Sequence, residues 1–350
     1  MSMTGVQGAV IDCTNSSPLS GLWSPQSHPK HLFYGPGCVQ RHLLNVLPSP
    51  KSRVFIMAGQ TLATQTPLIR QLEALLGSDL HAGTFAGIKQ HGQTAGVDDA
   101  LVQVSADPSI DTILSVGGGS PIDSAKRRLF DALFTRCTPR TLLLASGVRA
   151  IDHAVETVYH PQASLMPWKL TACWALGVLF KFLPLVAAKL DNGMAQPSSE
   201  AATHADSSSS SSSSLDDMLT VLMLAAYASS GLRGANLWRP YGISHGEMSC
   251  LTLAAVIRLK AKHSAEAASQ ISCFLLPAIR QTPTGDAVRD ALGFARLLDQ
   301  LVEQLGLKQR PLSERGIGMD QVPIIARRAV KGPEEKELRH AMTELVEALF

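Results

Sequence analysis

The stretch IDTILSVGGGSPIDSAK, residues 110–126, predicts a buried strand, a glycine turn and the start of a helix. Its first seven residues include four apolar side chains, a run of strand length. Gly117, Gly118 and Gly119 follow at once. Glycine permits positive φ and has no Cβ, so a bulky group can approach this backbone closely.

The residues after the glycines predict a helix whose first turn can bind an anion. Ser120 fits the N-cap, Pro121 the first helical position, and Asp123 stands three residues after the cap. Unpaired amides and the positive end of the helix dipole favour a phosphate there, and Lys126 can add a cation. The alternative is a tight turn without a ligand, because glycine turns are common. The spacing matches neither G-x-G-x-x-G nor G-x-x-x-x-G-K-[ST], so both general phosphate-binding signatures are absent.

The segment GGGSPIDSAK, residues 117–126, resembles the GGGSxxDxAK segment of the iron-type alcohol dehydrogenases, glycerol dehydrogenases and maleylacetate reductases. In that family the segment holds the pyrophosphate of NAD or NADP. The resemblance implies that six residues of this chain bind a nicotinamide cofactor: Gly117, Gly118, Gly119, Ser120, Asp123 and Lys126.

Length and composition predict a soluble globular protein of two domains. The chain has 350 residues, 45% of them hydrophobic and 17% charged, with a net charge of +2. Basic residues are scattered and aromatic residues few, which predicts no nucleic-acid partner. Six cysteines show no zinc spacing, so free thiols in a reducing compartment are expected. Residues 170–190 come nearest to a membrane span, but Lys181 interrupts them, and a buried helix is favoured.

The order of elements predicts an α/β domain followed by an all-α domain. Expected strands alternate with helices as in a parallel, Rossmann-like sheet covered on both faces, with ligands beyond the carboxyl ends of the strands. The strands are expected at 31–39, 53–58, 80–87 and 110–116. The helices are expected after Gly59 through Leu76 and at 94–106. Beyond residue 138 the sequence predicts no strand, and helices at 148–160, 165–190, 215–232, 247–280, 286–306, 319–330 and 333–349.

The expected organisation is an irregular segment at 1–30, a dinucleotide-binding domain at 31–137 and a helical domain at 138–350. Residues 198–217 contain eight consecutive serines, which cannot bury enough apolar surface to become ordered. We therefore expect a disordered insertion there, between two helices. Residues 1–30 show no secretory signal, so a cytoplasmic location is expected. A mitochondrial location is the alternative, because these residues include one acidic residue and several serines.

A second region, SGVRAIDHAVETVYHP at 146–161, places Arg149, His153 and Glu156 on one helical face. The alternative is an ordinary helix with His153 satisfied in the core. The stretch resembles the family's metal-binding pattern G-x-D-A-L-x-H-A-x-E, which implies that His153 is a ligand position. The ligand aspartate of that pattern is Arg149 here, and a guanidinium donates hydrogen bonds but cannot coordinate a cation.

A third region, YGISHGEMSCLTL at 241–253, resembles the family's G-x-x-H-G helix entry. This implies that His245 is the last ligand position; the alternative is a structural or solvated histidine. The further ligand histidine that precedes it in the family is absent from residues 231–240. His153 and His245 are then a remnant of the metal site and suit a divalent ion poorly. Iron or zinc is not expected, as in the metal-independent maleylacetate reductases.

The middle of the chain is shorter than the family pattern. Between Lys126 and Arg149 lie 22 residues, and they lack the Pro-Thr-Thr turn that approaches the cofactor in family members. The shortening is either genuine or the result of a lost exon. If it is genuine, the nicotinamide side of the cofactor site is incomplete.

The resemblance implies NAD(P)-dependent interconversion of an alcohol and an aldehyde or ketone. His245 is expected to transfer a proton or orient the substrate, with His153 as its partner. A fixed guanidinium at Arg149 would stabilise developing alkoxide charge in place of a metal and favour a carboxylate-bearing substrate. A non-redox lyase or isomerase and a catalytically inactive binding protein remain open as alternatives. The expected partner is a small-molecule substrate, and no membrane association is expected. The apolar faces of the helices would allow a homodimer.

Overall fold

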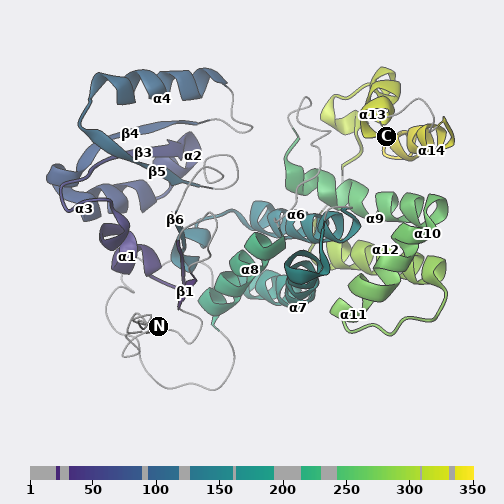
Figure 1. Cartoon of the computed structure of the whole chain (residues 1–350). Coiled ribbons are helices and arrows are strands. Elements are labelled where there is room, and N and C mark those ends of the chain that lie inside the picture. The colour runs from purple at the N-terminus through teal and green to yellow at the C-terminus, as the bar shows by residue number, and fades with distance from the viewer. Residues whose placement is uncertain are drawn as a thin grey trace, which may run out of the picture. The chain divides into compact units, whose positions relative to one another are not determined.

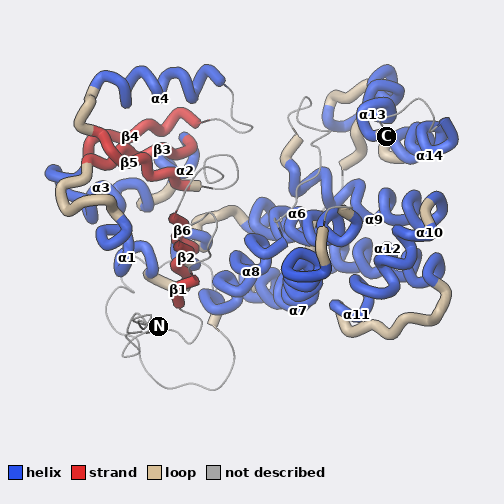
Figure 2. The backbone as a smooth tube through the Cα atoms, viewed as in Figure 1, coloured by secondary structure: helices blue, strands red, loops and turns tan. Residues whose placement is uncertain are grey.

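The structure is a computed structural model of the whole chain (Figure 1). The residues it describes are 21–23, 31–88, 94–117, 127–160, 163–192, 214–229, 243–307, 310–330 and 336–350. The chain divides into two compact units, Met1–Cys137 and Thr138–Phe350. Among the described residues, all strands belong to the first unit and the second is helical (Figure 2). The predicted fold class, an α/β part followed by an all-α part, is confirmed.

The first unit contains a parallel sheet in the strand order β4–β3–β5. Its strands are β3 Arg53–Gly59, β4 His81–Ile88 and β5 Ile110–Val116. The connecting helices are α2 Gln60–Gln65, α3 Leu68–Leu80 and α4 Thr94–Ala106. Because parallel strands need crossover connections, α4 lies on one side of this sheet and α3 on the other (Figure 1). The central strand is the most buried, with Val54, Ile56 and Ala58 at 0% exposure.

A second small sheet has the order β1–β2–β6, with β1 Gly21–Trp23, β2 His31–Tyr34 and β6 Arg127–Phe130. β1 pairs with β2 antiparallel, and β2 pairs with β6 in parallel. The strand expected at 31–39 is shorter than predicted. Gly35 and Gly37, at φ of 111° and 70°, turn the chain after Tyr34 into α1, Cys38–Val46.

A buried carboxylate joins the end of β6 to two helix starts. Asp131 is 3% exposed and accepts hydrogen bonds from the backbone N–H groups of Gly37 (2.9 Å) and Val39 (3.1 Å) at α1. It also accepts one from Leu133 (3.0 Å) in α5, Ala132–Thr135. A buried negative charge is stable here because three N–H donors and two helix N-termini face it.

The second unit is a bundle of helices: α6 Arg140–Tyr159, α7 Leu170–Asp191, α8 Leu215–Ser229, α9 His245–His263, α10 Ala265–Gln270, α11 Leu276–Ala278, α12 Ala287–Gln304, α13 Val322–Ala329 and α14 Lys336–Glu347. Short π-helical turns, Leu165–Lys169 and Ile271–Leu275, precede α7 and α11. Two 3₁₀ turns, Ser313–Arg315 and Met319–Gln321, precede α13. α6 begins eight residues before the predicted start, just after Pro139, and the predicted helix 247–280 is divided at Ser264, which caps α10.

Two expectations about this unit need correction. The serine-rich insertion was expected to reach residue 217, but α8 already begins at Leu215, and Asp216 and Asp217 lie in its first turn. Carboxylates are stable there because they face the positive end of the helix dipole. Residues 198–213, with the serine run, lie outside the described part of the chain.

The apolar helix α7 is buried on one face, through residues such as Leu176, Leu179 and Leu183. Its opposite face is open, with Leu170, Trp174 and Leu185 exposed by 45%, 51% and 44%. The segment Leu165–Asp191 is long and apolar enough to cross a membrane, a test that core helices of soluble proteins also pass. The prediction of a buried helix therefore applies to one face of α7.

Candidate functional site

The first predicted site lies at the carboxyl edge of the parallel sheet. There Gly59 pairs with Ile88, and Ala58 pairs with Val116. Gly117 follows at a φ of 139°, and a Cβ built on it meets no atom of the described residues within 4 Å. The backbone conformation alone therefore favours glycine at this position. The other predicted cofactor residues lie outside the described part of the chain: Gly118, Gly119, Ser120, Asp123 and Lys126.

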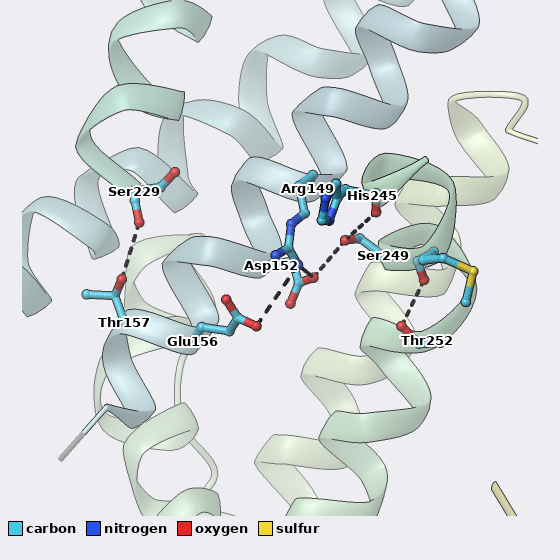
Figure 3. A network of polar contacts seen from close by, with 9 residues as sticks. Arg149, Asp152, Glu156, Thr157, Ser229, His245, Ser249 and Thr252 are labelled. Atoms are coloured by element: carbon cyan, nitrogen blue, oxygen red, sulfur yellow. Dashed lines mark hydrogen bonds and ion pairs between the residues drawn. The ribbon is translucent and has the colours of Figure 1, made fainter. Parts of the chain in front are cut away.

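The second predicted site is a line of charged side chains on α6 (Figure 3). The guanidinium of Arg149 forms a close ion pair with the Asp152 carboxylate and lies 4.0 Å from a Glu156 oxygen. The Arg149 and Asp152 side chains are 19% and 15% exposed. Two carboxylates thus compensate the charge of Arg149. The predicted carboxylate-bearing substrate would need a cation free of such partners, and Arg149 is not one.

The third predicted residue, His245, occupies the first position of α9. Ser244 caps this helix: its hydroxyl accepts from the Glu247 N–H (3.4 Å) and donates to the Glu247 carboxylate (2.9 Å). A Cβ on the next residue, Gly246, would stand 2.6 Å from the backbone C and O of Ala145. The glycine therefore lets α9 begin directly against α6, one turn before Arg149.

Ser249 joins the two helices. Its hydroxyl lies 2.7 Å from Oδ2 of Asp152 on α6 and 3.0 Å from the carbonyl oxygen of His245, one turn back on α9 (Figure 3). The ion pair of Arg149 and the start of α9 are therefore parts of one network. We call this set, Arg149, Asp152, Glu156, His245 and Ser249, the α6–α9 network.

A lysine extends the network along α9. Lys260 follows Ser249 by three turns, and its Nζ lies 4.4 Å from the centroid of the Tyr159 ring. Although much of this side chain is exposed, desolvation of its ammonium lowers the pKa of Lys260, while the carboxylates of Glu156 and Asp152 oppose that shift. The two cations and two carboxylates of this region balance one another.

Tyr159, at the end of α6, is the least satisfied polar group beside the network. Burial raises the pKa of its phenol. Among the described atoms, its hydroxyl has no hydrogen-bond partner. The phenol is therefore held in its neutral form.

The sequence analysis anticipates part of this arrangement. His153 lies half-buried on α6, as the helical pattern predicts, and His245 lies at a helix start. Asp152 is the partner of the Arg149 guanidinium, because residues three apart are neighbours on a helix. The sequence analysis misses Ser249 and Lys260. The signal available for them is their spacing from His245 and from each other along one face of α9.

The described side chains around Arg149 do not form a set of ligands for a divalent metal. In the described ranges, no three side chains of His, Cys, Asp or Glu come together as metal ligands. Asp152, the carboxylate nearest to the aligned ligand position, is already engaged by a guanidinium and a hydroxyl. A cation at this place would have to displace Arg149, which stays protonated.

Comparisons with known proteins agree with the fold. The sequence profile described as iron-containing alcohol dehydrogenase matches residues 29–136. The structure is similar to an alcohol dehydrogenase from Oenococcus oeni, with 14% identity, a TM-score of 0.71, and coverage of 95% of this chain and 100% of that one. It is also similar to maleylacetate reductase from Agrobacterium tumefaciens, with 16% identity, a TM-score of 0.64, and coverage of 94% of this chain and 99% of that one. A third similar structure is the aldehyde reductase YqhD from E. coli, with 16% identity, a TM-score of 0.66, and coverage of 93% of this chain and 100% of that one. No curated protein sequence matches significantly.

At sequence identities this low, the similarity to solved structures shows a shared fold, which combines an α/β part with a helical part. The profile match covers most of the α/β part. Together these findings show a profile match to iron-containing alcohol dehydrogenase in the α/β part and a fold shared with such enzymes over the whole chain. The names of the matched profile and of these similar structures are those of oxidoreductases.

Proposed function

We propose that this protein is a metal-independent, NAD(P)-dependent oxidoreductase that interconverts an alcohol with an aldehyde or ketone. The observation that carries the proposal is the family match over residues 29–136. It includes the glycine segment, and the described beginning of that segment, Gly117, stands at the carboxyl edge of the parallel sheet with a positive φ.

The proposed cofactor residues hold the pyrophosphate of the dinucleotide. Backbone amides of Gly117, Gly118 and Gly119 would approach it without a Cβ between them and the phosphates. The sequence predicts that Ser120 and Asp123 would cap a helix there and that Lys126 would add a positive charge. The bound nicotinamide would supply or accept the hydride. The choice between NAD and NADP is left to the titration described below.

The α6–α9 network gives His245 a fixed backbone position for proton transfer. Gly246 seats the helix start on Ala145, and Ser249 ties the same turn to Asp152. His245 is proposed to exchange a proton with the substrate oxygen, with His153 as the second imidazole. Arg149 is proposed as a positioning residue: it holds Asp152, which in turn holds Ser249.

The test is a titration of purified protein with NADH and NADPH, with metal content measured on the same sample. We expect micromolar binding of one cofactor, and turnover of aldehydes from a substrate panel that persists after chelation. Gly117→Val should weaken binding at least about tenfold, because a β-branched residue is strained at a φ of 139°. Gly285→Val is the matched control: Gly285 also has positive φ (92°) and open space, but lies in the helical unit.

The second candidate function is a catalytically inactive or repurposed member of the family. Two observations favour it: the ion-paired Arg149 at the position of a family metal ligand, and the shortened stretch between Lys126 and Arg149. A repurposed lyase or isomerase would convert substrate without any nicotinamide cofactor. An inactive binding protein would bind neither NADH nor NADPH, and that result would end the dehydrogenase proposal.

A further inference from the structure

A cavity of about 800 Å³, open to solvent along the exposed face of α7, lies in the helical unit between α7, α12 and the segment that ends α11. Its volume falls in the range of small-molecule sites. Much of its wall is apolar, with side chains that include Trp174, Val178, Phe182, Ile279 and Leu297. No residue of the α6–α9 network lines it. The cavity is therefore a place separate from the proposed active site.

The wall of the cavity is packed closely where α7 meets the end of α11. A Cβ on Gly177 would stand 2.5 Å from the carbonyl oxygen of Ala278, so the two segments touch through a glycine. The Phe180 ring, which also lines the cavity, lies 6.0 Å from the ring of the fully buried Phe294. The apolar wall is thus anchored to the core of the unit.

The charge of the cavity has one sign. Lys181 and Arg280 line it, and none of the described residues that line it is acidic. The Lys181 ammonium lies 4.9 Å from the centroid of the Phe182 ring, which holds it beside the apolar wall. The neighbouring acid on α12, Asp299, forms an ion pair with Arg258 of α9. The cavity thus combines an apolar wall with two cations and no carboxylate of its own.

The backbone at Arg280 supplies an independent observation. Arg280 has a φ of 61°, the one positive φ of a residue other than glycine in the described part of the chain. It ends α11 in a Schellman motif: Gln281 donates to the Leu276 carbonyl (3.0 Å) and Arg280 to the Pro277 carbonyl (3.0 Å). Glycine is the usual residue there, because a Cβ is strained in this conformation. An arginine at a glycine position, on the wall of a cavity, indicates a use for its guanidinium.

We propose that this cavity binds an amphiphilic carboxylate, a free molecule with an aliphatic chain and one acidic head group. The chain would lie along Trp174 and Phe182, and the carboxylate would pair with Arg280 and Lys181. A guanidinium binds a carboxylate through two parallel N–H···O bonds, and an ammonium adds a point charge. The apolar wall removes the chain from water.

The experiment is calorimetric titration of the full chain with sodium dodecanoate below its micellar concentration, together with its neutral analogue dodecanol. We expect saturable binding of one dodecanoate, with dodecanol at least about tenfold weaker because it has no charge to pair. Binding to the folded state should also raise the melting temperature. A brominated dodecanoate should quench the fluorescence of Trp174, and Trp174→Phe should remove that quenching.

The decisive variant is Arg280→Gly. This change removes the backbone strain of the positive φ and also removes the guanidinium. We therefore expect at least about tenfold weaker dodecanoate binding with an unchanged or higher melting temperature. Arg280→Lys should retain most of the affinity. Arg310→Gly, which removes an exposed arginine from a loop of the same unit away from the cavity, is the matched control and should bind as the unchanged protein does.

Three results would overturn the proposal. One is equal affinity for dodecanoate and dodecanol. Another is a melting temperature that falls with added dodecanoate, as for a detergent that binds the unfolded chain. The third is binding to phosphatidylglycerol vesicles with none to free dodecanoate, which would make the exposed face of α7 a membrane contact. None of these results bears on cofactor binding, so the proposed oxidoreductase activity is tested separately.

Discussion

The helical unit contains two groups of charged side chains that differ in how their charges are compensated. In the α6–α9 network, Arg149 faces two carboxylates, and Lys260 stands near the same pair. At the cavity beside α7, Lys181 and Arg280 face apolar side chains. Paired charges of low exposure hold helices in position, whereas cations without acidic neighbours attract ligands. The family resemblance indicates only the α6–α9 network as a functional site, whereas the charges and apolar surfaces of the structure indicate the cavity as well.

The largest expected effect tests the paired group. Asp152→Ala leaves the largely buried Arg149 with the more distant Glu156 alone and removes the acceptor of Ser249. We expect a loss of about 3 kcal/mol in the free energy of unfolding, measured by urea denaturation. Asp299→Ala removes the same residue type from the exposed pair with Arg258 and should cost less than about 1 kcal/mol. Equal losses in the two variants would show that the network is no more than a surface ion pair.

The next effect concerns the seating of α9 on α6. Gly246→Ala should destabilise the protein by about 2 kcal/mol, because its Cβ would meet the Ala145 backbone at 2.6 Å. It should also reduce turnover by displacing His245. Gly293→Ala is the matched control within a helix: its Cβ meets nothing closer than 3.8 Å, so it should be neutral or stabilising by up to about 1 kcal/mol. A harmless Gly246→Ala would contradict the close approach of the two helices.

A smaller effect is expected from pH. Burial, with Glu247 and Asp152 nearby, raises the pKa of the Cys250 thiol to about 12. Because the thiol has a higher pKa in the folded than in the unfolded state, its contribution to the free energy of unfolding is complete below about pH 9. That contribution is lost as the pH rises from there towards 12. We expect Cys250→Ala to lessen the loss of stability between pH 8.5 and 10 by about 1 kcal/mol.

The matched thiol for that experiment is Cys173, which lines the cavity. Burial raises its pKa to about 11, and Lys169 opposes that shift. Cys173→Ala should therefore lessen the alkaline loss to a similar extent or less. Denaturation curves at several pH values for both variants check this. A larger effect of Cys173→Ala than of Cys250→Ala on the alkaline loss of stability would mean that water reaches the Cys173 thiol less readily than the Cys250 thiol.

The smallest effect concerns the backbone at the cavity. Arg280→Gly should stabilise the protein by about 0.5 to 1 kcal/mol, because glycine adopts a φ of 61° without strain. Arg280→Ala also removes the guanidinium but keeps the Cβ, and should bring no such gain. Thermal denaturation of the two variants separates the backbone cost from the charge. Equal stability of both would show that the conformation at Arg280 is not strained.

The parts of the fold that could be predicted are those whose signal is local. The apolar runs at 53–58 and 110–116 predict β3 and β5 within a residue. β3 is central and apolar on both faces, whereas β5 lies at the edge of the described sheet with Ile113 47% exposed, so the prediction that 110–116 is a buried strand is wrong. β1 and β6, of three and four residues, are too short to show a period and are strands because they pair with β2. Their prediction requires knowledge of tertiary pairing.

The same distinction holds for the candidate site. The spacing of Arg149, His153 and Glu156 is visible in the sequence, and so is the start of α9 at His245. The link between Ser249 and Asp152 joins residues 97 apart in the chain, and no local pattern indicates it. The left-handed conformation of Arg280 is equally hidden, because nothing in the sequence marks an arginine that occupies a glycine position.

The carboxylate of Asp131 has a consequence for the order of folding. Its hydrogen bonds to Gly37 and Val39 close loops of 94 and 92 residues, and β2 pairs with β6 over the same span. The β4–β3–β5 sheet joins segments that are nearer in the chain and loses less entropy on closure. We therefore expect the parallel sheet to form first and the Asp131 junction to close last. In native-state hydrogen exchange, the amides of Gly37 and Val39 would then open before those of β3.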